Sequence, residues 1–492
     1  MNSVLGFSDF IRVSPMIVLF LASLIPITIK VLRGNQEQSG EATLIQGLGG
    51  IVFAAILLLT VRFAVLEAPS ATAFVGALVL DGITFTISLI VLAAAAVSLI
   101  LMYDNPATNG DQFSELTFLT LSSVLGMLIL IAATDLVIVF IGLETMSLAL
   151  YLMIAMSHEQ KLSKEAAFKY FVLGSFASAI FLYGISFVFG TTGSTQIPTM
   201  VEQTGQLIST NRLFLFGVVM LILGFCFKVS IAPFHAWTPD VYQGAPTPHA
   251  AFMATAVKAT SFAAFLRIIS TKSLVGSENL LNLLQWLAVI TMLVGNMAAI
   301  VQTNFKRMLA YSSIAHSGYL LVGLITAGIS QEAAFGNSSV VFYLVGYSLM
   351  TLGAFALVSM MERSENTVLL VDGMAGYAKR RPIMSLCLTV FLLSLAGVPP
   401  TVGFFGKFYL FAGAIGEGLM WLAIWGMLNS VMSAYYYLRP IVMMYMSEGH
   451  PEESAETLNA TRSVMVITAV LVVALGLFSG PVFTAIEKAM AN

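Results

Sequence analysis

Residues 224–262 read GFCFKVSIAPFHAWTPDVYQGAPTPHAAFMATAVKATSF, and this stretch decides the fold. Two apolar runs each carry one lysine, Lys228 and Lys258, on either side of a segment that contains prolines and histidines. A charged residue at the centre of an apolar membrane helix costs about 2.5–3.5 kcal/mol to insert. Pro233 lacks the N–H that a helix needs, so the helix must bend or unwind there. In a bilayer, unwound backbone persists only where protein or a wet cavity pairs its polar groups.

Two interpretations of these lysines are open. They are either functional groups buried beside a broken helix, or groups of a kinked packing helix that extend to the membrane surface. The second interpretation requires lysines near helix ends. Lys228 and Lys258 each lie about ten residues or more from one end of a roughly 20-residue crossing, which favours the first.

The composition is that of a multi-pass membrane protein. Hydrophobic residues make up 58% of the 492 residues and charged residues only 10%, against about 25% charged in a soluble domain. With about 20 residues per crossing, we expect an all-α polytopic membrane fold with about 14 transmembrane helices. The predicted crossings are 13–32, 45–66, 79–103, 115–132, 134–156, 164–190, 211–239, 246–270, 280–303, 306–328, 336–361, 382–413, 419–446 and 462–485.

The composition and motifs also exclude several classes of function. No basic segment with interleaved aromatic residues is present, so we expect no nucleic-acid partner. Cys226 and Cys387 are isolated and belong to no C-x-x-C motif, so we expect no iron–sulfur cluster and no zinc or other metal site. Both read as small hydrophobic residues of apolar helices.

Glu144 lies about ten residues into the predicted crossing 134–156, near the centre of the bilayer. A carboxylate at that depth stays charged only beside a positive partner, and Lys228 is the expected partner. Separation of the pair would then leave Lys228 able to lose its proton. The alternative is a protonated Glu144 that is hydrogen-bonded to a backbone carbonyl.

Two later crossings carry further ionisable groups. His316 lies in MLAYSSIAHSGYLLVGL, where the small hydroxylated residues either permit close helix packing or hydrate the imidazole. The crossing 382–413 is the second broken one, because Gly397, Pro399 and Pro400 cannot hold a regular helix. Lys407 follows that break by about two turns.

The two broken crossings are the seventh and the twelfth, and their odd spacing predicts two inverted five-helix repeats. The strings YFVLGS (170–175) and YLVGYS (343–348) are a faint echo of such a repeat. We expect helices 1–3 within residues 1–110, the first repeat (helices 4–8) within 111–275, the second repeat (helices 9–13) within 276–450, and helix 14 within 451–492. The excess of Lys and Arg in alternate connections predicts that both termini face away from the cytoplasm.

The motifs themselves resemble a known family. GFCFKVSIAPFHAWTPDVYQGAPTPHAAF, GLETMSLALYLMIA, KRMLAYSSIAHSGYLL and SLAGVPPTVGFFGKF resemble the antiporter-like membrane subunits of respiratory complex I, a proton-translocating NADH:quinone oxidoreductase. HAWTPDVYQGAPTP is most similar to the subunit N branch. The resemblance covers nearly the whole chain and is weakest in the first three crossings. Subunit M of that family is expected to carry a glutamate in the second broken helix, where Lys407 stands here.

The resemblance implies a proton relay that is driven by redox chemistry in other subunits. Glu144 would pair with Lys228, Lys258 would be the central relay, His316 would bridge, and Lys407 would serve the exit half. It also implies other membrane subunits of the complex, M and K, and lipids as partners. It implies no cofactor in this chain, no directly bound NADH or quinone, and a place in the bacterial inner membrane. The alternatives are a stand-alone cation/proton antiporter subunit and a passive structural subunit.

Overall fold

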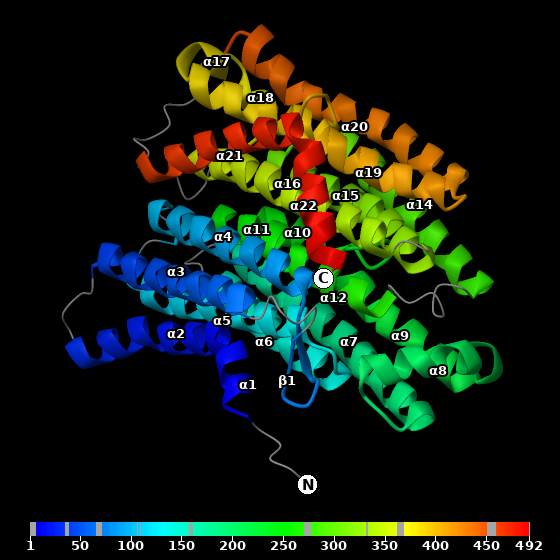
Figure 1. The fold of residues 1–492 in the computed structure, drawn as a ribbon. Coiled ribbons are helices and arrows are strands. Elements are labelled where there is room, and N and C mark those ends of the chain that lie inside the picture. Colours follow the sequence, from blue (N-terminus) through cyan, green and yellow to red (C-terminus); the bar gives the residue numbers. More distant parts are fainter. Residues whose placement is uncertain are drawn as a thin grey trace.

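The computed structural model describes residues 6–34, 39–64, 71–105, 107–108, 110–156, 161–269, 277–330, 333–361, 369–449 and 459–491. These residues form a bundle of long helices with one short hairpin (Figure 1). The elements of the first half are α1 (Phe7–Arg12), α2 (Ser14–Arg33), α3 (Gly40–Ala64), β1 (Ala71–Ala73), β2 (Leu78–Leu80), α4 (Gly82–Asp104), α5 (Phe113–Ala132), α6 (Leu136–Ala155), α7 (Lys161–Thr192), α8 (Ile197–Thr210), α9 (Arg212–Lys228), α10 (Trp237–Gly244), α11 (Thr247–Phe252), the π-helical turn η1 (Met253–Val257) and α12 (Lys258–Ile269). Those of the second half are α14 (Glu278–Ile300), α15 (Phe305–Ile329), α16 (Ala333–Met361), the 3₁₀ turn η2 (Asp372–Met374), α17 (Tyr377–Arg380), α18 (Pro382–Ala396), α19 (Val402–Gly416), α20 (Met420–Met446), α21 (Asn459–Leu477) and α22 (Ser479–Ala491).

The predicted all-α membrane fold is confirmed. Among the described residues, eleven helices are long and apolar enough to cross a membrane, or twelve if the bent pair α8–α9 counts as one crossing. They occupy eleven of the predicted intervals. The other three intervals hold α9, the pair α18 and α19, and α20. Both predicted breaks are present, since α9 and α10 are separated by residues 229–236, and α18 and α19 by residues 397–401.

Three features differ from the expected pattern. Residues 197–210 form α8, which meets α9 at a bend of 119°. Only Ile197, Met200 and Thr204 of α8 are buried, so its polar composition concealed it among the connections. The strands β1 and β2 pair as an antiparallel hairpin where only a connection was expected. The last predicted crossing divides at Phe478, because Pro481 fits the first turn of a new helix but not a helix interior.

Burial separates the centre of the bundle from its rim. The crossing formed by α11, η1 and α12 is almost wholly buried inside the protein, and so are α15 and α16. By contrast, most side chains of α2, α3 and α21 are partly or fully exposed. Since lipid is as apolar as these exposed side chains, the rim suits a bilayer, whereas polar groups at the centre face only protein. The ionisable residues at the centre are therefore sheltered from lipid.

Glycines bring neighbouring helices into close contact in both halves of the chain. A side chain at Gly142 would lie 3.0 Å from the Gly126 carbonyl oxygen and 2.8 Å from a backbone nitrogen of α5, so α5 and α6 pack backbone against backbone. Gly295 and Gly318 play the same part between α14 and α15, where a side chain would come within 2.5 Å of Ala315 or Met292. Small residues at the contact are the usual way in which membrane helices associate.

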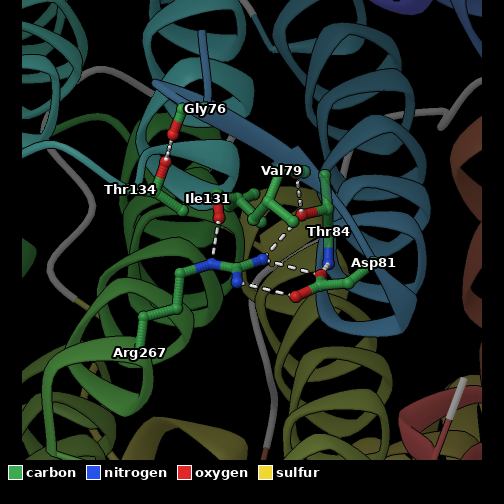
Figure 2. Close-up of polar contacts among 7 residues, drawn as sticks. All are labelled: Gly76, Val79, Asp81, Thr84, Ile131, Thr134 and Arg267. Carbon is green, nitrogen blue, oxygen red and sulfur yellow. Dashed lines mark hydrogen bonds and ion pairs between the residues drawn. The ribbon is translucent and has the colours of Figure 1, made fainter. Parts of the chain in front are cut away.

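An ion pair joins the hairpin side of the bundle to the central crossing (Figure 2). The Arg267 guanidinium on α12 donates to both carboxylate oxygens of Asp81 at 2.7 Å, to Thr84 at 2.7 Å and to the Ile131 carbonyl at 2.6 Å. Asp81 also caps α4 by accepting from the Thr84 N–H. Burial raises the pKa of Asp81, but the charge and hydrogen bonds of Arg267 outweigh it and hold that pKa below its usual range.

We expect the Asp81→Asn variant to lose about 1.5–3 kcal/mol of stability near neutral pH, the usual contribution of hydrogen bonds to a charged group. Because the folded-state pKa is lowered, this contribution is present above the unfolded pKa of about 3.9 and is lost as the pH falls through the folded value. The difference between the two proteins should therefore shrink in acid. Thermal unfolding in detergent, measured from neutral to acidic pH, checks both parts.

The surface pair of Asp372 with Arg439 provides a matched control. It is also an Asp–Arg contact, at 3.0 Å, but the Asp372 side chain is 66% exposed. Exposed pairs contribute little to stability, so Asp372→Asn should unfold like the parent protein. An Asp81→Asn variant as stable as the Asp372→Asn variant would contradict the role given to Arg267.

Candidate functional site

Lys228 is buried at the point where α9 ends. Its ammonium donates to the Ser147 hydroxyl at 2.8 Å and to the Tyr151 hydroxyl at 3.4 Å, both on α6. The nitrogen also lies 5.9 Å from the centre of the Tyr170 ring on α7. The lysine therefore points inward between α6 and α7, and the interpretation as a surface-directed lysine is wrong.

Glu144 is half-buried on the same face of α6, one turn before Ser147. Its carboxylate accepts a hydrogen bond from the Ser178 hydroxyl of α7. In the part of the chain that the structure describes, Glu144 and Lys228 form no direct ion pair, unlike the expectation from the sequence. Lys228 reaches α6 one turn further along, so hydroxyls rather than the carboxylate receive its hydrogen bonds.

The break after Lys228 is paired by protein groups. The Trp237 indole N–H donates to the Phe227 carbonyl at 2.9 Å, and the Thr291 hydroxyl accepts from the Ala232 N–H at 3.0 Å. Ser230 takes a left-handed conformation with φ of 60° and shares a hydrogen bond with Thr238. These contacts satisfy the polar groups that unwinding exposes, which is the condition for a broken helix at membrane depth.

Lys258 follows the π-helical turn η1 directly. Such turns widen a helix by one residue and are frequent at functional sites. The buried ammonium donates to both the carbonyl and the hydroxyl of Ser313 on α15, each at 2.5 Å. It lies 4.8 Å from the centre of the Tyr347 ring, and the Tyr347 hydroxyl donates to Ser313 at 3.0 Å. Ser313 is thus hydrogen-bonded both to Lys258 and to Tyr347 of α16.

His316 lies one turn beyond Ser313 on α15 and is 1% exposed. Nδ1 and the Tyr343 hydroxyl are 2.5 Å apart, and Nε2 and the Tyr437 hydroxyl are 3.0 Å apart. Tyr437 is also hydrogen-bonded to Ser312. Both ring nitrogens of His316 therefore meet hydroxyls that can donate or accept, which suits an imidazole that exchanges protons.

Lys407 lies across the second break. From α19 its ammonium donates to the carbonyl oxygens of Leu395 and Ala396 at the end of α18, and to the Ser430 hydroxyl of α20, all at 2.9 Å. Gly397 ends α18 with φ of 91°, a conformation that favours glycine. The cation thus sits on the negative end of a helix dipole, in contact with helices on either side.

The structure brings the predicted residues into the interior, but hydrogen bonds join them only in part. Lys258 of α12 contacts Ser313, which lies one turn before His316 on α15. No single hydrogen bond among the described residues joins Lys228 or Lys407 to Lys258 or His316. Sequence reasoning missed the tyrosines that surround the row of ionisable residues, which consists of Glu144, Lys228, Lys258, His316 and Lys407. The helical spacing of Glu144, Ser147 and Tyr151 was the available signal for two of the missed partners. The others are Tyr343, Tyr347 and Tyr437.

A second polar cluster, whose side chains are partly exposed, lies beside the first break. Asp240 on α10 accepts from Lys169 of α7 and from Arg307 of α15, each at 2.8 Å, and Lys169 also pairs with Glu165. These residues line a cavity of about 140 Å³. Across the described ranges, no three His, Cys, Asp or Glu side chains gather into a group that could hold a metal ion.

Comparison with known proteins identifies the family. A model described as "NADH:quinone oxidoreductase/Mrp antiporter, TM" matches residues 133–433, more than half of the chain. NADH-quinone oxidoreductase subunit N of Bdellovibrio bacteriovorus is 64% identical over 490 residues and is covered completely, as is this chain. The chain belongs to the NADH-quinone oxidoreductase subunit N family. Subunit N of Chloroflexus aggregans is 39% identical over 448 residues, which cover 90% of this chain and 89% of that one.

A solved structure agrees with the assignment to respiratory complex I. A chain of respiratory complex I from Thermus thermophilus with bound aureothin matches with a TM-score of 0.79 and 32% identity, over 96% of this chain and 99% of that one. A chain of the Mrp complex from Dietzia sp. matches with a TM-score of 0.83 over 98% and 97%, but at 16% identity it shows a shared fold alone. The expectation of an antiporter-like, multi-pass subunit in the membrane arm of a bacterial NADH:quinone oxidoreductase is confirmed.

Proposed function

We propose that this subunit N chain translocates protons along Glu144, Lys228, Lys258, His316 and Lys407, driven by redox chemistry in other subunits. One observation carries the proposal. Lys258 of α12 is hydrogen-bonded to Ser313 of α15, one turn before His316, inside helices that are almost wholly buried. A buried ionisable group is costly in a membrane and is functional by default.

The partners of the lysines suit groups that gain and lose protons. Lys258 and Lys407 contact hydroxyls and backbone carbonyls, and within the described ranges neither forms an ion pair with a carboxylate. No fixed negative charge therefore ties either ammonium to its charged form. A proton that arrives at one site changes the field at the next, because charges in a medium of low dielectric act strongly on each other. Sequential loading along the row follows from this coupling.

Other membrane subunits and lipids are the partners that we propose for this chain. Subunits M and K of the complex and lipids cover the apolar side chains that α2, α3, α20 and α21 expose. NADH, quinone and redox cofactors bind in other subunits, so the work of this chain is confined to protons. The five residues of the proposed relay are Glu, Lys and His, none of which is a redox group.

We expect Lys228→Ala in the assembled enzyme to lower the number of protons pumped per NADH oxidised. The loss arises because no group that can carry the proton remains between Glu144 and the residues Lys258 and His316. A positioned proton-transfer group contributes about 10²–10⁴-fold to its step. Pumping by the purified complex in proteoliposomes, measured beside NADH oxidation, gives the ratio directly.

Two outcomes would favour other functions. Full pumping in the Lys228→Ala and Lys258→Ala enzymes would leave this chain as a passive structural subunit. Purification of the chain without the redox subunits, together with cation/proton exchange by the isolated preparation, would instead indicate a stand-alone antiporter. The Glu144→Gln variant tests whether the charge of Glu144 is needed. Unchanged pumping would indicate that Glu144 is neutral and has only a structural role.

A further inference from the structure

Tyr170 on α7 is fully buried, and its hydroxyl has no hydrogen-bond partner among the described residues. Packing explains the ring, which stacks on Trp237 with centroids 4.6 Å apart and meets Tyr151 edge-on at 4.7 Å. Packing does not explain the hydroxyl, because a buried tyrosine usually pairs its O–H. An unpaired buried polar group costs about 1–3 kcal/mol, and a phenylalanine would fill the same space without that cost.

Tyr170 lies between groups that contact Lys228 and groups that lead to Lys258. On one side lies Tyr151, whose hydroxyl accepts from Lys228. One turn further along α7, Gly174 leaves room for that contact, since a side chain there would come within 2.0 Å of the Tyr151 oxygen. On the other side lies Tyr242 of α10, whose ring meets Trp237 edge-on with centroids 6.4 Å apart, while Tyr170 stacks on the same indole.

Tyr242 leads onward to the central lysine. Its side chain lies near that of Ser313, the residue whose hydroxyl and carbonyl accept from Lys258. Ser313 is also hydrogen-bonded to Tyr347. Among the hydroxyls that lie between Lys228 and Lys258, the Tyr170 hydroxyl is thus the one without a hydrogen-bond partner in the described residues.

We propose that Tyr170 is a relay residue through which a proton passes from Lys228 to Lys258. Lys228 gives one proton to the Tyr151 oxygen while Tyr151 passes its own to Tyr170. Tyr170 passes its proton to Tyr242, and from there one proton moves through the serine beside Lys258 to the neutral amine of Lys258. Each oxygen gains one proton and loses one, so a single positive charge moves between the lysines and every hydroxyl stays neutral. This assignment rests on the proton translocation proposed above.

The second half of the chain offers a parallel. In the alignment of YFVLGS with YLVGYS, Tyr170 corresponds to Tyr343. The Tyr343 hydroxyl lies 2.5 Å from Nδ1 of His316, in direct contact with an ionisable group of the row. A tyrosine at the corresponding helical position thus already contacts the row in one half.

The test uses Tyr170→Phe in the complete enzyme, reconstituted in proteoliposomes. The substitution removes one oxygen and leaves the ring stacked on Trp237. We expect pumping per NADH oxidised to fall to the level of a Lys258→Ala enzyme prepared in parallel, while thermal stability is unchanged or higher. If Tyr170 has only a structural role, pumping should be unchanged, because removal of an unpaired hydroxyl leaves nothing unsatisfied. Tyr242→Phe should lower pumping in the same way.

Tyr409→Phe is the matched control, since the Tyr409 ring of α19 stacks on Phe483 at 4.0 Å, outside this sequence of hydroxyls. It should pump fully. If Tyr170→Phe also pumps fully while Lys258→Ala does not, the relay role of Tyr170 is wrong and the proposed function stands. If Lys258→Ala pumps fully as well, the proposed function itself is wrong.

Discussion

Replacement of Lys258 by alanine is expected to stop proton transfer through this chain. The ammonium is the only cation that contacts Ser313 among the described residues, and Ser313 is the hub that joins α12, α15 and α16. Alanine carries no proton, so a charge that arrives from Lys228 has no site to occupy. The affected step should slow by about 10²-fold or more. Protons pumped per NADH oxidised would fall accordingly in proteoliposomes.

Lys164→Ala provides the control for Lys258→Ala. It is the same substitution of one lysine, made at an exposed position near the start of α7. We expect assembly and pumping of this variant to match the parent enzyme. Assembly of the Lys258→Ala complex should be checked by the presence of its redox subunits and by its NADH oxidation, so that a failure to assemble is not taken for a failure to pump. Parent-level pumping in a correctly assembled Lys258→Ala enzyme would contradict the central role of the residue.

Replacement of Lys407 is expected to have two effects that can be separated. The ammonium carries a charge, and it also pairs the carbonyls of Leu395 and Ala396 at the end of α18. Lys407→Ala removes both functions, and an unpaired buried carbonyl costs about 1–3 kcal/mol. We therefore expect lower thermal stability together with loss of pumping. Lys407→Gln retains N–H donors without the charge, so it should preserve more stability while pumping is still lost.

Thermal unfolding and pumping, measured for both Lys407 variants, check this separation. If Lys407→Gln pumps like the parent enzyme, the charge is not needed and Lys407 serves only to hold the break together. If the two variants are equally destabilised, the donated hydrogen bonds are not what stabilises the end of α18. In either case, one of the two roles assigned to Lys407 is contradicted.

The sequence predicted the buried charges better than their surroundings. A lysine or glutamate in an apolar crossing is conspicuous because its insertion is costly, so Glu144, Lys228, Lys258 and Lys407 could be named. Tyr170 could not, because tyrosine in a membrane helix is also an ordinary packing residue. Its role depends on whether its hydroxyl is paired, and that depends on neighbours distant in the chain.

The direct contact of Glu144 with Lys228 was wrongly expected for a related reason. Opposite charges near the same depth suggest a pair, but sequence spacing does not tell which turn of α6 faces the end of α9. A shift of one turn exchanges Glu144 for Ser147. The π-helical turn before Lys258 was equally hidden, because MATAV has no proline or glycine to mark it. The inverted repeats and the division of the chain into 1–110, 111–275, 276–450 and 451–492 stay predictions.

Asp240 gives the molecule a sensitivity to the surrounding electrolyte. One carboxylate oxygen of Asp240 pairs with Lys169 of α7 and the other pairs with Arg307 of α15. If either helix moves, the other must therefore move with it or an ion pair must break. The aspartate side chain is 33% exposed, and counterions weaken contacts that water can reach. Dilute buffer would therefore tighten the mechanical link between these helices, and concentrated salt would slacken it.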